Sequence, residues 1–246
     1  MRDTGLLIIT NLKNNLRSKI VLLIYIIIVV ICVLSLTATF CLITIAPEMS
    51  KDSPDKSMLE LYLGLIMYST SLIALGVYIN AFAANSLTRE KSRSIIESLL
   101  ATPLKSKDIW IARSIAIFIP GLIIGVIFTL IVMIAVNYIY FVPRIGFIFN
   151  PWIAVSSFLA APLIYICLSF ITHLIGLTGK PANANIIVQI FLPVFVTLMI
   201  NLTIHNVLDM NSWSFTAVNI GVAAIIIIAI IPLLHRLTNE RIVLSS

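Results

Sequence analysis

The stretch "SIAIFIPGLIIGVIFTLIVMIAVNYIYFVP" covers residues 114–143 and contains no Asp, Glu, Lys or Arg. A helix needs about 20 consecutive apolar residues to cross about 30 Å of hydrocarbon, and this run is longer than that. Its lack of charge fits a membrane, because a Lys, Arg or Asp at the centre of a spanning helix costs about 2.5–3.5 kcal/mol. The run is apolar on all sides, whereas strands of a membrane barrel alternate apolar and polar residues. It therefore predicts a transmembrane helix.

The rest of the chain repeats this pattern, with five more charge-free runs at 20–47, 61–88, 145–179, 181–208 and 210–235. Only 11% of the 246 residues are charged, against about a quarter in an ordinary soluble domain. We predict an all-α integral membrane protein whose residues 1–246 form a single transmembrane domain. Its six transmembrane helices are expected near 20–45, 60–86, 111–138, 152–177, 183–205 and 212–234.

The basic residues predict the orientation of the chain. If the N-terminus is inside, the outer loops hold Lys51, Lys56 and Arg144, and the inner segments hold the other thirteen of the sixteen Lys and Arg residues. Such an excess is typical of cytoplasmic loops. We expect a multi-pass protein of the plasma membrane with both termini in the cytoplasm. The net charge of +6 then reflects orientation and lipid contact, and no nucleic-acid partner is expected.

Residues 4–18, "TGLLIITNLKNNLRS", are typical of an amphipathic helix that lies in the membrane interface. One face can carry the apolar side chains, and Lys13, Asn14 and Arg17 lie opposite. A ragged start to the first transmembrane helix is the alternative. The apolar face comprises Leu6, Leu7, Ile9, Leu12 and Leu16.

One charged stretch interrupts the apolar pattern at residues 88–110, "TREKSRSIIESLLATPLKSKDIW". Ile95, Ile96, Leu99 and Leu100 fall on one face at helical spacing after a charged start. Thr102 precedes a proline, which disfavours helix, so this helix is expected to stop near Ala101. A new helix should begin at Ser106 or Lys107. The stretch predicts a short amphipathic cytoplasmic helix between the second and third transmembrane helices, lying either on the membrane or against another protein.

The same stretch, read to Arg113, resembles the signature of the ABC-2 family of ABC-transporter permeases. That signature has an acidic and basic cluster, an apolar helix that ends Leu-Leu-x-Thr/Ser-Pro, a polar turn and then the next transmembrane helix. The chain also resembles the family in topology, with a short N-terminal helix and six transmembrane helices. The residues that match the signature are Glu90, Ser94, Glu97, Leu99, Leu100, Thr102 and Pro103.

The resemblance implies a permease subunit that dimerises and binds a separate ATPase polypeptide. The helix between the second and third transmembrane helices would act as a coupling helix and dock on the ATPase. Nothing in the chain is expected to bind a cofactor, because ATP would be bound by the partner subunit, and whether the dimer is a homodimer or a heterodimer stays open. The residues assigned to ATPase coupling are Glu90, Ser94, Ile95, Ile96, Glu97, Leu99, Leu100, Thr102 and Pro103.

Polar side chains within the apolar runs are candidates for the transport pathway, because they are costly in hydrocarbon. We single out Asn80, His173 and Gln189, although hydrogen bonding between helices is the more common explanation of such residues. No carboxylate or arginine lies deep in a run, which favours an apolar or amphipathic substrate such as a lipid, peptide or drug-like molecule.

Other functions remain as alternatives. An ATP-independent carrier would place Asp, Glu or Arg at the membrane centre. An intramembrane enzyme needs convergent His, Asp, Glu or Cys, and none of these converge here, so we expect no enzymatic activity, no catalytic residue and no metal site. A non-transporting assembly or immunity factor of the same fold is the remaining alternative to the permease, because topology and motif are compatible with it too.

Overall fold

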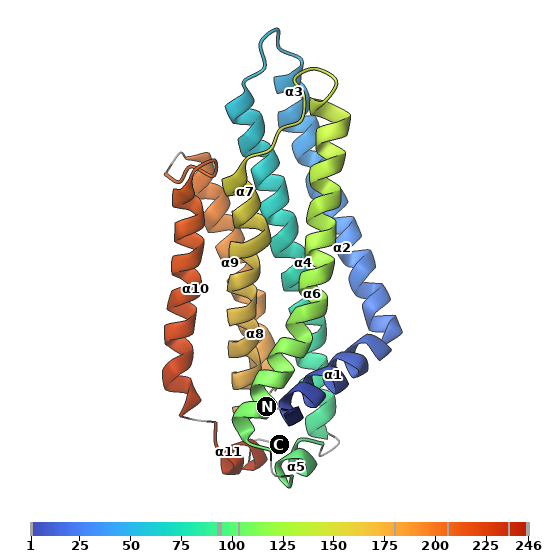
Figure 1. The fold of residues 1–246 in the computed structure, drawn as a ribbon, viewed down its shortest axis with the longest axis vertical. Coiled ribbons are helices and arrows are strands. Elements are labelled where there is room, and N and C mark those ends of the chain that lie inside the picture. Colours follow the sequence, from blue (N-terminus) through green and yellow to red (C-terminus); the bar gives the residue numbers. More distant parts are fainter. Residues whose placement is uncertain are drawn as a thin grey trace.

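A computed structural model describes residues 2–92, 95–102, 104–179, 181–205, 207–235 and 237–244 of the chain. These residues form an upright bundle of helices, and no strand occurs among them (Figure 1). Six of the helical segments are long and apolar enough to cross a membrane, as the sequence predicted. They cover Lys19–Met49, Lys56–Phe82, Ser106–Phe141, Pro151–Thr178, Ile186–Ile204 and Trp213–Leu234.

The long segments are built from eleven helical elements, three of which are single π-helical turns. These elements are α2 (Lys19–Phe40), η1 (Cys41–Ile45), α3 (Ala46–Met49), α4 (Lys56–Ser92), α6 (Ser106–Val136), η2 (Asn137–Phe141), α7 (Pro151–Val155), η3 (Ser156–Ala160), α8 (Ala161–Thr178), α9 (Pro181–Ile204) and α10 (Trp213–Leu234), where α3 only extends the first segment by one turn.

Three short helices gather at one end of the bundle, where both chain termini also lie (Figure 1). They are α1 (Arg2–Arg17), α5 (Ile95–Leu100) and α11 (Asn239–Leu244). We call this end the α5 end. The opposite end carries α3, α7 and the loops beside them (Figure 1). The N-terminal helix expected at 4–18 is therefore confirmed as a helix, and it packs against α6. Its place in the membrane interface stays a prediction.

Helix α4 is the centre of the bundle. It contacts α2, α6, α8 and α9, and most of its membrane segment is buried. Helix α10 packs on α8, at the edge of the bundle away from α2 (Figure 1). Glycine permits the close approach of α6 to α4, since a Cβ added at Gly121 would lie 2.9 Å from the Tyr78 ring. Tyr78 also stacks on Phe82, with 4.4 Å between ring centroids.

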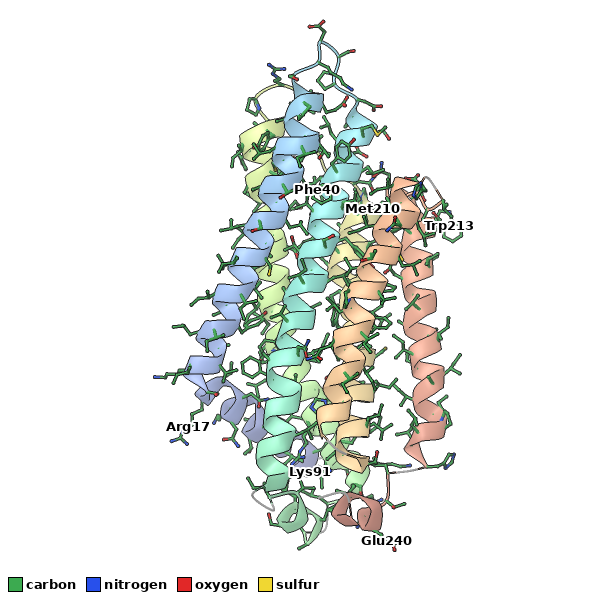
Figure 2. All side chains as sticks on the ribbon, turned by 180° about the vertical axis from the view of Figure 1, so that it is seen from behind. Arg17, Phe40, Lys91, Met210, Trp213 and Glu240 are labelled. Atoms are coloured by element: carbon green, nitrogen blue, oxygen red, sulfur yellow. The ribbon has the colours of Figure 1, made fainter. Side chains whose placement is uncertain are left out.

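Large apolar side chains cover the outside of the bundle, and Figure 2 shows them pointing away from it along α2 and α10. An outer surface of this kind is stable in lipid and not in water. Among the exposed residues are Ile27 and Ile31 on α2, Ile131 on α6 and Ile228 on α10. The chain is thus a multi-pass membrane protein.

The start of the charged stretch at 88–110 differs from its prediction. The chain remains in α4 as far as Ser92, so the charged start belongs to the end of a 37-residue helix rather than to a separate one. Good helix formers at Arg89, Glu90 and Lys91 allow this continuation. The expected stop near Ala101 and the new start at Ser106 are both confirmed, since α5 ends at Leu100 and α6 begins at Ser106.

Candidate functional site

The site lies at the α5 end, where α5 packs against α4 and α11. Its apolar side chains do not share one outward face. Ile96 is 1% exposed and belongs to the core, and Leu100 packs against that core one turn later. Ile95 is 39% exposed, and Ser98 and Thr102 are exposed beside it. The face that is free to meet another protein is therefore narrower than the sequence suggested.

Local hydrogen bonds end α5. The Ser98 hydroxyl donates to the carbonyl of Ile95 at 2.8 Å, and both the hydroxyl and the amide of Thr102 donate to the carbonyl of Leu99. Such bonds satisfy carbonyls that the helix end leaves without partners. Leu99 itself is half-buried. The next helix begins after Lys105, whose backbone is extended, and the negatively charged Asp108 lies in its first turn.

Several predicted coupling residues lie outside the described part of the chain. This holds for Ser94 and Pro103, and for the side chains of Glu90 and Glu97. The backbones of Glu90 and Glu97 lie in α4 and α5. The assignment of these residues to ATPase coupling stays a prediction.

The C-terminal segment closes the site on one side, which sequence reasoning missed. Leu237 and Ile242 are buried in the core, and α11 contacts both α5 and α8. The Ser106 hydroxyl at the start of α6 donates to the side-chain oxygen of Asn239 at the start of α11. The only sequence signal was a weak one, namely apolar residues at 237 and 242 within a polar tail.

Lys91 lies near the α5 end of the bundle (Figure 2). Its side chain is 9% exposed, and its Nζ donates to the main-chain carbonyl of Gly179 at 2.7 Å. Gly179 follows α8, so the bond ties the end of α4 to the turn between α8 and α9. Burial lowers the pKa of Lys91, because the charged ammonium is poorly solvated there. Sequence reasoning did not predict this contact, because the partner of Lys91 lies 88 residues away in the chain.

Helices α6 and α8 are joined by side-chain hydrogen bonds just above the site. The Trp110 Nε1 donates to the carbonyl of Phe170 at 2.8 Å, and the two rings lie 5.1 Å apart. The Ser169 hydroxyl donates to the carbonyl of Ser114 at 3.0 Å. Arg113 lies between these contacts along α6 and is only 3% exposed. These contacts hold α6 and α8 together near the α5 end.

The three pathway candidates lie at similar depth but in different surroundings. His173 on α8 is fully buried, and its Nδ1 is 2.8 Å from the carbonyl of Ser169. Asn80 on α4 is half-buried, and Gln189 on α9 is exposed. Leu87 on α4 and Ala184 on α9 both lie beside Gly176 on α8, so these three residues are at the same depth in the bundle. Counted from that level at 1.5 Å per residue, the three candidates lie within about one helical turn of one another along the bundle axis. They do not form one site, and their role in transport stays a prediction.

Within the described residues, no three His, Cys, Asp or Glu side chains gather where they could hold a metal ion. Cys32, Cys41 and Cys167 are free thiols.

The comparison with protein families gives one match, to the model described as "ABC-2 family transporter protein", over residues 47–235. The chain belongs to the ABC-2 family of transporter proteins. The match covers the second to sixth membrane segments of this ABC-2 chain together with α5, and it leaves α1, most of the first segment and α11 outside. The comparisons with curated proteins and with solved structures give no match for it.

Proposed function

We propose that this ABC-2 chain is the membrane subunit of an ATP-driven exporter, and that it binds a separate ATPase subunit at the α5 end. ABC-2 membership supports a transport role. The observation that carries the proposal is the position of α5, which projects from the end of the bundle (Figure 1). Ile95 and Ser98 on this helix and Thr102 just after it are exposed. ATP would be bound by the ATPase subunit.

The contacts around α5 support its role as a coupling element. A displacement of α5 by the ATPase would move α4, which α5 contacts directly. Through the Lys91 hydrogen bond it would also move the turn that leads into α9. The link from Ser106 to Asn239 would pass the same displacement to α6 and α11. A change at one small surface can be amplified in this way when packed helices have two discrete arrangements.

The orientation of the chain in this proposal follows the basic residues. The α5 end carries Arg17, Lys91 and most of the other Lys and Arg residues, and faces the cytoplasm of a cell with the chain in its plasma membrane. The outer surfaces of the membrane segments are mostly apolar, which is compatible with an apolar or amphipathic substrate.

The test is a mild-detergent purification of the tagged chain from its host membranes, followed by mass spectrometry of the proteins that accompany it. We expect an ATPase at about one copy per permease chain. Purification without an ATPase, under conditions in which a known ATP-driven exporter stays assembled, would overturn the coupling role. ATP-dependent flux in vesicles made with the purified complex then separates an exporter from a non-transporting assembly or immunity factor.

A further inference from the structure

Helix α1 carries both apolar and basic side chains on the side that faces away from the bundle. Leu6, Ile9 and Leu16 are 60%, 53% and 40% exposed there, and Lys13 and Arg17 are exposed among them. At 100° per residue, these five side chains fall within an arc of about 100°. The two cations are therefore flanked by exposed apolar residues, whereas the sequence predicted that they lie opposite the apolar face.

The other side of α1 faces the bundle. Leu7 and Leu12 are half-buried there, and α1 packs against α6. On the outward side, the exposed polar residues Thr10 and Asn14 follow after Arg17. Going around the outward side of the helix, the side chains are thus mainly apolar at first, then basic, and finally polar and uncharged. This order matches the order of acyl chains, phosphates and water at a membrane surface.

The position of α1 places its basic residues at the edge of the membrane. Arg17 is the last residue of α1, and Lys19 begins the first membrane segment, Lys19–Met49. Figure 2 shows Arg17 at the side of the bundle, where α1 meets α2. Lys19 is exposed as well. Lys and Arg side chains at such a position can reach lipid phosphates while their apolar stems contact the acyl chains.

The charges on this side of α1 have no acidic partner within the described residues. Lys13, Arg17 and Lys19 take part in no ion pair there, and the ion pair that is present joins Lys51 to Glu48 at the opposite end of the bundle. Lys13 and Arg17 are four residues apart, and like charges at this spacing destabilise a helix. A phosphate bound between them would remove that repulsion.

We infer that the outward face of α1 binds an anionic phospholipid from the adjacent leaflet of the membrane. Lys13 and Arg17 would hold the headgroup phosphate, to which a guanidinium can donate two parallel hydrogen bonds. Leu6, Ile9 and Leu16 would contact the acyl chains, and these contacts distinguish a lipid from a water-soluble phosphate. The site lies outside residues 47–235, over which the chain matches the ABC-2 family, and it is separate from the ATPase-binding surface proposed at α5.

The test is lipid binding to the purified full chain, measured by native mass spectrometry from a detergent that leaves lipids bound. The probes are dioleoyl phosphatidylglycerol, which is anionic, and dioleoyl phosphatidylcholine, which has no net charge. We expect the unmodified chain to bind phosphatidylglycerol about tenfold more tightly than phosphatidylcholine, because each basic residue near the membrane surface adds to the attraction of an anionic headgroup.

Substitutions at exposed positions separate the site from the overall charge of the chain. Lys13→Gln combined with Arg17→Gln should abolish the preference for phosphatidylglycerol and leave the binding of phosphatidylcholine unchanged. The matched control is Lys105→Gln combined with Lys107→Gln, which removes the same charge from two exposed lysines around the start of α6 and should keep the preference. Ile9→Gln should weaken the binding of phosphatidylglycerol by several-fold, although it changes no charge, because it removes an apolar contact with the acyl chains.

Three results would overturn the inference. The first is equal binding of the two lipids by the unmodified chain. The second is an equal loss of preference in the α1 pair and in the control pair, which would mean that only the net charge matters. The third is displacement of the bound lipid by glycerol 3-phosphate at a similar concentration, which would mean that the site takes a water-soluble phosphate. None of these measurements involves the ATPase, so failure of this inference is distinguished from failure of the proposed function.

Discussion

Lys91 donates a hydrogen bond to the main-chain carbonyl of Gly179 at 2.7 Å, across 88 residues of sequence. The contact places a mostly buried ammonium group at the meeting point of α4 and the turn between α8 and α9. It gives the bundle a direct connection between α4, the helix that precedes α5, and the residue that ends α8.

Replacement of Lys91 by Met should loosen this connection. Methionine is similar in length and apolar but cannot donate, so the Gly179 carbonyl loses this partner. We expect a loss of about 1–3 kcal/mol in the free energy of unfolding, typical of a buried polar group whose partner is removed. Thermal unfolding in detergent measures the change. Lys105→Met, at an exposed lysine, is the control and should leave the midpoint unchanged.

The pH dependence of the same comparison has a definite sign. The pKa of Lys91 is lowered by burial in the folded chain, and its ordinary value is 10.5. Between the lowered pKa and about 10.5 the unfolded chain binds more protons than the folded chain, so stability rises with pH in this window. The folded chain with Lys91 should therefore gain stability relative to Lys91→Met as the pH is raised toward 10. A flat difference between the two proteins over this range would show that Lys91 is not buried as a charged group.

The membrane segments could be predicted from sequence because each depends on its own composition. A charge-free run such as residues 114–143 has few alternatives to a transmembrane helix. The end of α5 was equally local, since Thr102 precedes a proline. These features need no knowledge of the neighbouring helices.

Which side chains of α5 are exposed and which are buried could not be predicted, because this depends on segments far away in the chain. Ile95 and Ile96 look alike in sequence, and only the packing of α4 and α11 makes one of them exposed and the other buried. The same is true of Lys91, whose partner Gly179 lies beyond two further membrane segments. Gln189 is also evident in the sequence as a polar residue, but its exposure depends on how α9 packs against α4 and α8.

The two faces of α5 can be separated by neighbouring substitutions. Ile95→Asp adds a charge on the exposed side and should leave the chain folded while it reduces the amount of ATPase that co-purifies by about tenfold. Ile96→Asp buries the same charge in the core and should prevent stable folding, because an isolated buried carboxylate costs far more than an exposed one. Gel filtration and quantitative mass spectrometry measure the two effects. Full ATPase binding by Ile95→Asp would exclude Ile95 from the docking surface.

Packing of α6 on α4 should be sensitive to a single methyl group at Gly121. An added Cβ there would lie 2.9 Å from Cδ1 and 3.1 Å from Cγ of Tyr78, which is stacked on Phe82 and has little room to move. We expect Gly121→Ala to destabilise the chain by about 1–3 kcal/mol, as overpacking does. Gly221→Ala on α10 is the matched control, since an added Cβ there meets nothing within 4 Å. Similar unfolding temperatures for the two variants would argue against the close α4–α6 contact.

Asn150 organises the opposite end of the bundle, and two substitutions can separate its roles. Its side-chain oxygen accepts from the Trp152 amide at 2.9 Å and caps α7, while its Nδ2 donates to Glu60 at 3.1 Å and to the carbonyl of Asn211 at 3.3 Å. Asn150→Ala should cost about 0.5–2 kcal/mol from the lost cap, at any pH.

Asn150→Asp keeps the cap but sets a second carboxylate against Glu60. Two such groups cannot both ionise cheaply at this distance, so the variant should be destabilised at pH 7 and recover as the pH falls and one carboxyl takes up a proton. The difference in unfolding temperature between Asn150→Asp and the unmodified chain, measured from pH 7 to pH 5, checks this expectation. A difference that does not shrink on acidification would mean that Glu60 is not the partner of Asn150 in the membrane-embedded protein.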